Sequence, residues 1–227
     1  MDIKDRILYE DNHLIIVNKC VGELSQGDQS GDDTLIDTIK GYLKQTYKKP
    51  GNVYLGVVHR LDRPTSGAIV YAKTEKALGR LNELFRTDAV EKTYWAVVDT
   101  VPPHEKGELE HYLIKDPKTN KSRAVPKSRS GAKLARLSYE LIAASNTHYL
   151  LEVILQTGRH HQIRAQLEAI GLSIKGDLKY GSRRSNPDGG ICLHARSLSF
   201  IHPVKKERIT VIAPIPSTGV WQAFGSQ

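Results

Sequence analysis

The sequence predicts an α+β fold in which a mixed, mostly antiparallel central sheet is flanked by helices. Short apolar stretches rich in β-branched residues recur along the chain with turn residues between them, and only a few stretches carry apolar residues at helical spacing. Strands and helices do not alternate strictly, as they would in a doubly wound sheet. With 227 residues, 39% of them hydrophobic, the chain can bury the core that such a fold needs.

The predicted strands follow from alternating or β-branched apolar runs that are bounded by turn residues. Residues 7–19 form two short strands around an Asp-Asn turn, and residues 57–71 form two strands around a dense polar turn. A long hairpin covers residues 108–142 and has a basic stretch in its middle. Further strands are predicted at residues 92–98, 149–156, 192–202 and 208–213.

Helices are predicted where apolar residues recur every three or four positions after a capping residue. Asp32 or Asp33 can cap a first helix, and Thr74 precedes a second. A third helix begins in the turn at residues 157–164, and residues 217–224 form a short terminal helix. The helices are few, which favours an α+β fold over an all-helical one.

The positive charge of the chain is concentrated in two stretches. The formal net charge is +8, and eight bases stand against one acid between Lys115 and Arg136. Four more bases and one acid lie between Lys175 and Arg184. A basic patch of this kind is typical of a polyanion site, although a solvated basic loop is the alternative. Neither stretch has an apolar face at helical spacing, so binding to a membrane is not expected.

The cysteines and the apolar runs indicate the compartment. Cys20 and Cys192 match neither a metal-binding spacing nor a disulfide framework, which favours a reducing compartment. The first residues are charged and no apolar h-region follows them, and no apolar run is long enough to cross a bilayer. We therefore expect a cytoplasmic protein.

The polar turn between the second pair of strands displays one carboxylate, that of Asp62. Pro64 fixes its own φ and disfavours a helical conformation at the residue before it, and Gly67 allows a φ that other residues rarely adopt. Asp62 has an arginine nearby on each side, Arg60 and Arg63. Its carboxylate is either a catalytic group or a structural partner of these arginines.

Two other stretches contain candidate functional residues. Tyr94 follows Glu91-Lys92-Thr93 at the start of a predicted strand, and Arg164 ends the run Gly158-Arg159-His160-His161-Gln162-Ile163-Arg164. Each residue alone has an ordinary structural explanation, because a strand tyrosine usually packs in the core and a helix arginine is usually a surface charge. The histidines show no metal-ligand spacing.

The candidate residues belong to five short motifs. In chain order these are His59-Arg60-Leu61-Asp62-Arg63-Pro64-Thr65-Ser66-Gly67, Lys92-Thr93-Tyr94, the segment 157–164, the segment 174–181, and Leu193-His194-Ala195. In content and order they resemble the signature turn, the Lys-x-Tyr motif, the Thr-Gly-Arg-x-His-Gln-(Ile/Leu)-Arg motif, the Gly-Asp-x-x-Tyr-Gly stretch and the Leu-His-Ala strand of the RluA-type RNA pseudouridine synthases. The resemblance extends over about residues 7–212.

The resemblance implies the pseudouridine synthase fold, with a catalytic cleft across the sheet. We expect residues 1–227 to form a single catalytic domain without an N-terminal S4 domain, because the residues before position 7 are too few to form one. The sequence departs from the family pattern at Lys19-Cys20-Val21-Gly22, where Lys-Pro-x-Gly is usual, and at Leu137, where a threonine is frequent. Both departures affect loop and substrate contacts rather than the three key positions.

The resemblance implies an isomerase that converts specific uridines in rRNA or tRNA to pseudouridine. The N1–C1′ bond breaks, the uracil turns, and C5 joins C1′. No atoms are gained or lost and no redox change occurs, so neither a metal nor an organic cofactor is expected.

The catalytic roles carried over from the family fall on three residues. Asp62 matches the catalytic carboxylate, and whether it attacks C1′, attacks C6 or assists elimination to a glycal stays open. Arg164 is expected to pair with Asp62 and keep it ionised. Tyr94 is expected to stack on the uracil and to take part in base catalysis. All three side chains should meet in one cleft.

A stacked uridine must leave the RNA stack to reach such a cleft. Arg60 has a planar group suited to filling the vacated stack, and Ile163 and Leu193 are expected to form apolar pocket walls. The other predicted substrate or RNA contacts are Arg63, Lys92, Arg159, His160, Arg123, Lys127 and Arg129.

Two other functions stay open. A non-catalytic RNA-binding module would use the basic hairpin at residues 115–136 without requiring Asp62, Tyr94 and Arg164 together. A glycoside hydrolase also breaks a C1′ bond, but that chemistry usually requires two carboxylates. The expected partner is RNA, with no obligate protein partner, and the expected oligomeric state is a monomer.

Overall fold

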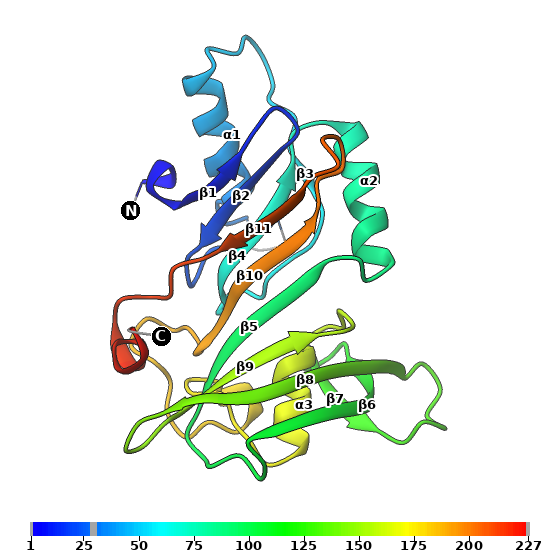
Figure 1. The fold of residues 1–227 in the computed structure, drawn as a ribbon, viewed down its shortest axis with the longest axis vertical. Helices are drawn as coiled ribbons and strands as arrows, with labels where there is room; N and C mark the ends of the chain where they lie inside the picture. Colours follow the sequence, from blue (N-terminus) through cyan, green and yellow to red (C-terminus); the bar gives the residue numbers. More distant parts are fainter. Residues whose placement is uncertain (1, 28–30, 226–227) are drawn as a thin grey trace. The chain divides into compact units, whose positions relative to one another are not determined.

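The computed structural model describes residues 2–27 and 31–225, which fold into two compact units (Figure 1). Unit 1 comprises the described residues within Met1–Glu91 and Ala195–Pro214, and unit 2 comprises those within Lys92–His194 and Ile215–Gln227. None of the helices in this part of the chain combines the length and apolar character that a bilayer crossing demands.

Unit 1 is built on strands that pair mostly antiparallel, with two α-helices. Neighbouring strands follow the order β1-β2-β4-β10, with β11 paired to β10 and the two-residue β3 paired to β4. The β2–β4 register runs from Leu14↔Ala72 to Lys19↔Gly67. The elements are η1 (Ile3–Arg6), β1 (Ile7–Glu10), β2 (Leu14–Lys19), α1 (Leu35–Thr46), β3 (Gly56–Val57), β4 (Ser66–Ala72), α2 (Glu75–Arg86), β10 (Leu193–Ile201, in unit 1 from Ala195) and β11 (Arg208–Ile212).

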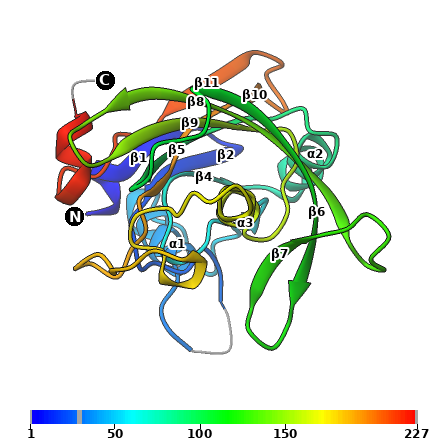
Figure 2. The same cartoon turned by 90° about the horizontal axis from the view of Figure 1, so that it is seen from below.

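The central strands of unit 1 are buried on both faces, as their continuous apolar sequences require. All residues of β4 are buried, and so are Leu14, Ile15, Ile16 and Val17 of β2. One apolar cluster joins β2 and β4 to α2, β10 and β11. Both ribbon views place α1 on one side of β1, β2 and β4 (Figures 1 and 2). The segment that leads into β4, residues 58–65, is therefore anchored to a rigid sheet.

Unit 2 contains five antiparallel strands and one helix. Its strands follow the order β5-β9-β8-β6-β7. Consecutive pairs along this order are antiparallel, including the seven-residue ladder from Lys92↔Leu155 to Val98↔Tyr149. The elements are β5 (Glu91–Val98), β6 (Lys106–Asp116), β7 (Lys121–Val125), β8 (Lys133–Ala144), β9 (Tyr149–Leu155), α3 (Gln162–Ala169), η2 (Leu178–Tyr180) and η3 (Gly219–Phe224).

Helix α3 lies against the curved strands β6, β7 and β8 (Figure 2). Ala165 of α3 packs with Leu113 of β6 and Ala135 of β8 in an apolar cluster. The fully buried Gln166 donates hydrogen bonds from its amide nitrogen to the carbonyls of Leu109 (3.1 Å) and Ala135 (3.2 Å). Small residues and a buried glutamine thus hold the helix close to the strands.

The α+β class and the mostly antiparallel pairing predicted from the sequence are confirmed. The N-cap of α1 was predicted wrongly: it is Thr34, not Asp32 or Asp33, and Thr34 and Asp37 form a reciprocal capping box. This arrangement satisfies two backbone N–H groups at once, whereas a single aspartate cap satisfies only one. The predicted cap of α2, Thr74, is confirmed by the hydrogen bond from the Ala77 N–H.

The predicted hairpin at residues 108–142 contains an additional strand. β6 and β8 form the long antiparallel pair, and β7, which contains Lys121 and Arg123 of the basic stretch, pairs with the other edge of β6. The basic stretch lacks the alternation of apolar residues by which strands are recognised, because an edge strand has polar residues on its solvent side. The predicted short terminal helix is present as the 3-10 helix η3, Gly219–Phe224.

Candidate active site

Asp62 lies in the turn between β3 and β4, and its side chain is half-buried. The Thr65 N–H donates to the carbonyl of Asp62 (3.0 Å) and closes the turn. On the other side of Asp62, the hydroxyl of the buried Ser25 donates to the Leu61 carbonyl (2.9 Å) and accepts from the Leu61 N–H (3.2 Å). The backbone on both sides of the carboxylate is therefore fixed by hydrogen bonds.

A buried ammonium group holds the same turn from within. Lys19, at the end of β2, has no exposed surface. Its Nζ donates to the carbonyls of Cys20 (3.0 Å), Asp62 (3.3 Å), Arg63 (3.1 Å) and Thr65 (2.7 Å). Burial lowers the pKa of Lys19 to about 8, although the charges of Glu23 and Asp62 oppose this shift.

Sequence reasoning assigned no role to Lys19, although the residue lies within a quoted motif. The available signal was its position: Lys19 ends a mostly apolar strand and is the first residue of the stretch that matches the family's Lys-Pro-x-Gly loop. The carbonyl oxygens of a turn can bind an ammonium only once the fold brings that turn to the end of β2. This contact depends on tertiary structure and is not visible in local sequence.

The arginines beside Asp62 differ in their surroundings. Arg63 pairs with Asp32 (3.0 Å), and its Nε donates to the Gly22 carbonyl (3.0 Å). The structural interpretation, in which the neighbouring arginines neutralise Asp62, therefore does not apply to Arg63. Arg60 is exposed.

Gly67 allows β4 to approach β10 closely. Its φ is +115°, and a Cβ atom at this position would lie 2.4 Å from both the nitrogen and the oxygen of Ala195. His59, at the other end of the signature turn, makes structural contacts. Its Nε2 accepts the Val70 N–H (3.2 Å), and its ring stacks on Phe85 with a centroid distance of 4.6 Å. The signature turn is thus packed into unit 1 at both ends.

In unit 2, Tyr94 and Lys92 lie on β5 and are both buried, with 9% and 6% of their surface exposed. They share one face of the strand because their positions differ by two. Ile163 and Leu193, the predicted apolar walls, are each 4% exposed. These low exposures show that the four side chains are largely shielded from solvent.

Arg164, on α3, forms a bidentate pair with a carboxylate that sequence reasoning did not single out. Its Nε donates to Asp177 Oδ2 (2.6 Å) and an Nη donates to Asp177 Oδ1 (2.8 Å). Both side chains are buried, with exposures of 6% and 1%. Two parallel hydrogen bonds fix the plane of the guanidinium. The predicted pairing of Arg164 with Asp62 would join the two units and stays a prediction.

Tyr180 connects this arginine to strand β7. The guanidinium of Arg164 lies 4.8 Å from the centroid of the Tyr180 ring. The Tyr180 hydroxyl accepts the Ser122 N–H (2.8 Å) and lies 2.8 Å from His161 Nδ1. The position of Arg164 is therefore coupled to that of the basic strand through one aromatic side chain.

Two of the predicted RNA contacts, His160 and Arg159, contact their own chain. His160 Nδ1 lies 2.8 Å from Ser122 Oγ, and its ring stacks on that of His161 at a centroid distance of 3.8 Å. Arg159 Nε donates to the Leu134 carbonyl (2.9 Å). By contrast, the predicted phosphate contacts Arg123, Lys127 and Arg129 are all exposed on or after β7.

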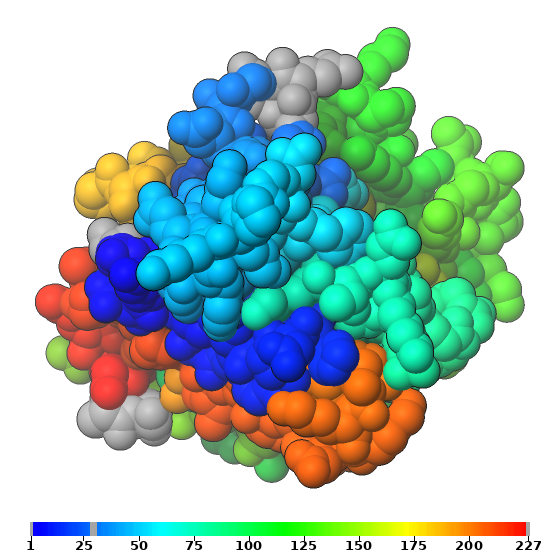
Figure 3. Space-filling view, turned by 90° about the horizontal axis from the view of Figure 1, so that it is seen from above, coloured from blue at the N-terminus to red at the C-terminus, as the bar shows by residue number. Residues whose placement is uncertain are grey.

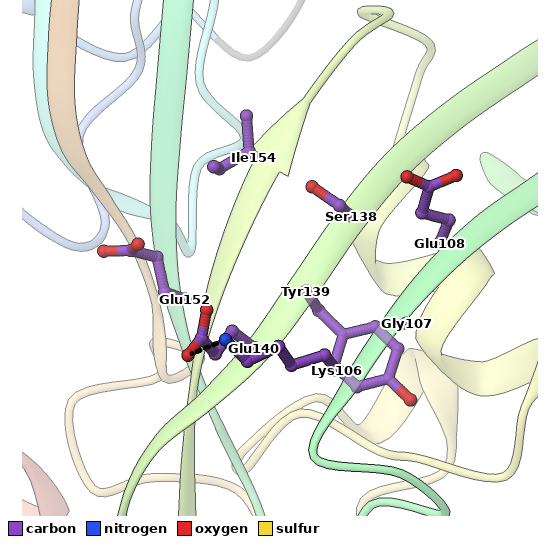
Figure 4. A pocket seen from close by; sticks show the side chains of 8 residues that line it. All are labelled: Lys106, Gly107, Glu108, Ser138, Tyr139, Glu140, Glu152 and Ile154. Atoms are coloured by element: carbon purple, nitrogen blue, oxygen red, sulfur yellow. Dashed lines mark ion pairs between the residues drawn. The ribbon is translucent and has the colours of Figure 1, made fainter.

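A cavity of about 310 Å³ on the strands of unit 2 involves none of the candidate residues (Figure 4). Its charged lining consists of Glu108, Glu140, Glu152 and Lys106, with Lys106 paired to Glu140 (2.8 Å). Acids outnumber bases there, so the cavity does not suit a polyanion. Within residues 2–27 and 31–225, no cluster of histidine, cysteine and acidic side chains could hold a metal ion.

Comparisons with known proteins place this chain among RNA-modifying enzymes. A protein-family model described as RNA pseudouridylate synthase matches residues 13–169. An uncharacterized RNA pseudouridine synthase of Synechocystis sp. is 35% identical over 215 residues, which are 93% of this chain and 65% of the relative. Ribosomal large subunit pseudouridine synthase D of Zymomonas mobilis is 31% identical, with 95% of this chain and 70% of the relative covered.

Solved structures support the fold. The structure of human RNA pseudouridylate synthase domain containing 4 matches with a TM-score of 0.79 and 24% identity, covering 94% of this chain and 90% of that chain. The chain spans about two thirds of the length of the curated relatives named above, 65% and 70%. Because the family model matches more than half of the chain, in a range that includes Asp62, Tyr94 and Arg164, the chain belongs to the RNA pseudouridylate synthase family, in agreement with its resemblance to the RluA-type enzymes.

Proposed function

We propose that this chain is an RNA pseudouridine synthase that isomerises uridine in ribosomal RNA. The observation that carries the proposal is the construction around Asp62: a half-buried carboxylate stands in the family's signature turn, and a buried ammonium binds the carbonyls of that turn. Ribosomal RNA is favoured as the substrate because a relative that the chain largely covers is named a ribosomal large subunit pseudouridine synthase. Transfer RNA is the second candidate.

In the proposed reaction Asp62 supplies the anionic group that acts on the sugar or the base of the target uridine. A carboxylate can attack carbon as a nucleophile or stabilise developing positive charge at C1′. The rigid turn keeps the carboxylate at one position while the uracil is detached and turned. A fixed catalytic group lowers the barrier because little reorganisation is needed in the transition state.

Arg164 and Tyr94 are proposed to complete the site. Asp177 orients the guanidinium of Arg164, which would pair with the carboxylate of Asp62. The ring of Tyr94 would stack on the uracil, and its hydroxyl would be near the C5 proton that leaves last. This assembly requires the three side chains to meet in one cleft across the sheet, which is part of the proposal.

RNA binding is assigned to exposed bases of β7 and of the segment between β7 and β8, among them Arg123, Lys127 and Arg129. They would neutralise phosphates, and Arg60 would fill the stack that the extruded uridine leaves. A single catalytic domain that acts as a monomer in the cytoplasm completes the proposal.

The test is isomerisation of a ribosomal RNA transcript by the purified chain and by its Asp62→Asn variant. We expect the wild-type chain to form pseudouridine and the variant to form none, with RNA affinity within about twofold of wild type because asparagine keeps the size of the side chain. Pseudouridine formation by the variant would refute the role of Asp62.

Two outcomes would favour the alternative functions. Tight RNA binding by the wild-type chain with no pseudouridine in any ribosomal or transfer RNA would indicate a non-catalytic RNA-binding module. Release of free uracil from the RNA would indicate hydrolysis of the glycosidic bond, the reaction class that usually requires a second carboxylate.

A further inference from the structure

The end of α1 and the loop that follows it form a basic surface on unit 1, outside every motif of the family. Residues 38–56 contain four lysines and no acid. Lys44, Lys48 and Lys49 are exposed, and Tyr47 between them has 51% of its surface exposed. Figure 3 shows this segment, in the lighter blue, on the surface of unit 1. We refer to these four residues as the α1-end patch.

Among the residues that the structure describes, no acidic side chain pairs with the lysines of the patch. In the described part of the chain, Lys44, Lys48 and Lys49 form no ion pair, whereas Lys73, Lys121 and Lys205 each pair with a carboxylate at 2.7–3.0 Å. A lysine paired within its own chain contributes little to binding an external anion. The unpaired ammonium groups of the patch are therefore available to one.

The backbone at the end of α1 adopts a left-handed conformation at Lys48, which is unfavourable for a residue with a side chain. Lys48 has φ +48°, in the left-handed region, and the N–H of Lys49 donates to the Lys44 carbonyl (3.1 Å). Glycine is the usual residue at this position after a helix because it adopts the left-handed conformation without strain. A lysine here places two adjacent positive charges at the turn.

Tyr47 is exposed but oriented. Its hydroxyl donates to Glu10 Oε1 (2.8 Å), and Lys73 Nζ lies 5.0 Å from its ring centroid. An aromatic ring that is held in place and still half exposed loses little conformational entropy when a ligand stacks on it. Aromatic rings flanked by positive charge are the usual binding platform for unpaired nucleotides.

We propose that the α1-end patch is a second RNA-contact surface that binds single-stranded nucleotides flanking the target uridine. Lys44, Lys48 and Lys49 contact phosphates and Tyr47 stacks on one base. The surface belongs to unit 1 and is separate in the chain from the basic hairpin of unit 2. The inference rests on the proposed function in that RNA is the ligand. An anionic membrane is the less suitable partner, because the patch has no apolar helix face to insert.

The charge contribution is tested with the triple variant Lys44→Gln, Lys48→Gln, Lys49→Gln. A matched control changes three other exposed lysines of unit 1 to glutamine, namely Lys4, Lys76 and Lys206. Affinity is measured by fluorescence anisotropy from about 50 to 300 mM salt, for a uridine-containing stem-loop with and without single-stranded flanks. We expect the salt slope for the flanked RNA to fall by about two for the patch variant, since each single-strand phosphate contact contributes about 0.7.

The control variant should keep the wild-type slope, and the RNA without flanks should bind both variants alike. Equal slopes for the patch variant, the control and the wild-type chain on flanked RNA would overturn the proposal. So would loss of binding to phosphatidylglycerol vesicles by the patch variant with an unchanged RNA slope, which would identify a membrane surface. Pseudouridine formation by the wild-type chain, assayed in parallel, decides the proposed function separately from these slopes.

The stacking contribution is tested with Tyr47→Ala and Tyr47→Phe. We expect Tyr47→Ala to weaken binding of the flanked RNA about tenfold at every salt concentration, because stacking does not depend on ion release. Tyr47→Phe keeps the ring and should stay within about threefold of wild type. Wild-type affinity of Tyr47→Ala for the flanked RNA would overturn the assignment of Tyr47.

Discussion

At the scale of single residues, the buried ion pair between Asp177 and Arg164 leads to the clearest prediction. The two carboxylate oxygens of Asp177 accept hydrogen bonds from Nε and an Nη of Arg164, and neither side chain has more than 6% of its surface exposed. A buried ion pair is not in itself a source of stability, because both charges lose their hydration. Removal of one partner, however, leaves the other charge buried and uncompensated.

We predict that Asp177→Ala lowers the free energy of unfolding by about 3–5 kcal/mol and reduces isomerisation. The measurement is denaturant unfolding of the wild-type chain and the variant. Asp32→Ala is the matched control, because Asp32 pairs with Arg63 on the surface, where the side chains are 49% and 53% exposed. That variant should change the free energy of unfolding by less than about 1 kcal/mol. Similar losses in both variants would contradict the prediction.

Asp62 and Asp177 show which kinds of residue role can be predicted from the sequence and which cannot. Asp62 was recognised because the residues around it form a local motif that fixes the backbone. Asp177 lies within another quoted motif, but its role depends on a helix that begins fifteen residues earlier, at Gln162. Lys19 was missed for the same reason, since three of its four carbonyl partners are more than forty residues away in the chain.

At the scale of elements, the pairing of β4 with its neighbours depends on one glycine. Gly67 has φ +115°, and a Cβ atom there would lie 2.4 Å from Ala195 backbone atoms. Neither the backbone conformation nor the contact tolerates a side chain.

We predict that Gly67→Ala costs at least about 3 kcal/mol of stability or prevents folding. Gly79→Ala is the control: Gly79 lies within α2, and a Cβ atom there meets nothing within 4 Å. This substitution should leave stability unchanged or raise it by about 0.5–1 kcal/mol, because alanine favours the helix. Thermal unfolding followed by circular dichroism compares the two. Wild-type stability of Gly67→Ala would show that β4 and β10 can separate.

The elements themselves were predicted to different extents. Strands with apolar alternation and the helix after Thr74 were found, because burial imposes a period that the sequence displays. The N-cap of α1 was placed too early, although Thr34 and Asp37 have the spacing of a capping box. Strand β7 was not separated from its hairpin, since its sequence is basic and it pairs only along the edge of β6.

At the scale of the whole molecule, a buried histidine makes stability depend on pH. His202 has no exposed surface, and its Nδ1 accepts the N–H groups of Val204 (3.1 Å) and Lys205 (2.8 Å). Burial lowers the pKa of His202, Asp11 opposes the shift from 3.0 Å, and Lys205 and His13 add to it. The unfolded chain therefore binds a proton at His202 at a higher pH than the folded chain does.

We predict that the contribution of His202 to the free energy of unfolding is constant above about pH 6.5 and falls as the pH drops below that value. The contribution of this single group to the slope is at most about 1.4 kcal/mol per pH unit. Unfolding of the wild-type chain and of His202→Asn between pH 7.5 and about 5 isolates the effect. The variant should be less stable at pH 7.5 and should depend less on pH. Parallel curves would rule out His202 as the titrating group.

The assembly of the catalytic groups also belongs to the whole molecule. Asp62 lies in unit 1, whereas Tyr94 and Arg164 lie in unit 2. Their separation in sequence gave no local signal that they act together, and only the resemblance to a family connected them.

The most direct measurement maps pseudouridines in total cellular RNA from cells that contain the wild-type chain, the Asp62→Asn variant, or neither. We expect one or a few uridines, in ribosomal RNA, to be modified only in cells with the wild-type chain. The variant should give the same map as cells without the protein, at equal protein abundance. Identical maps for the wild-type chain and the Asp62→Asn variant would contradict the assignment of this carboxylate as the catalytic group.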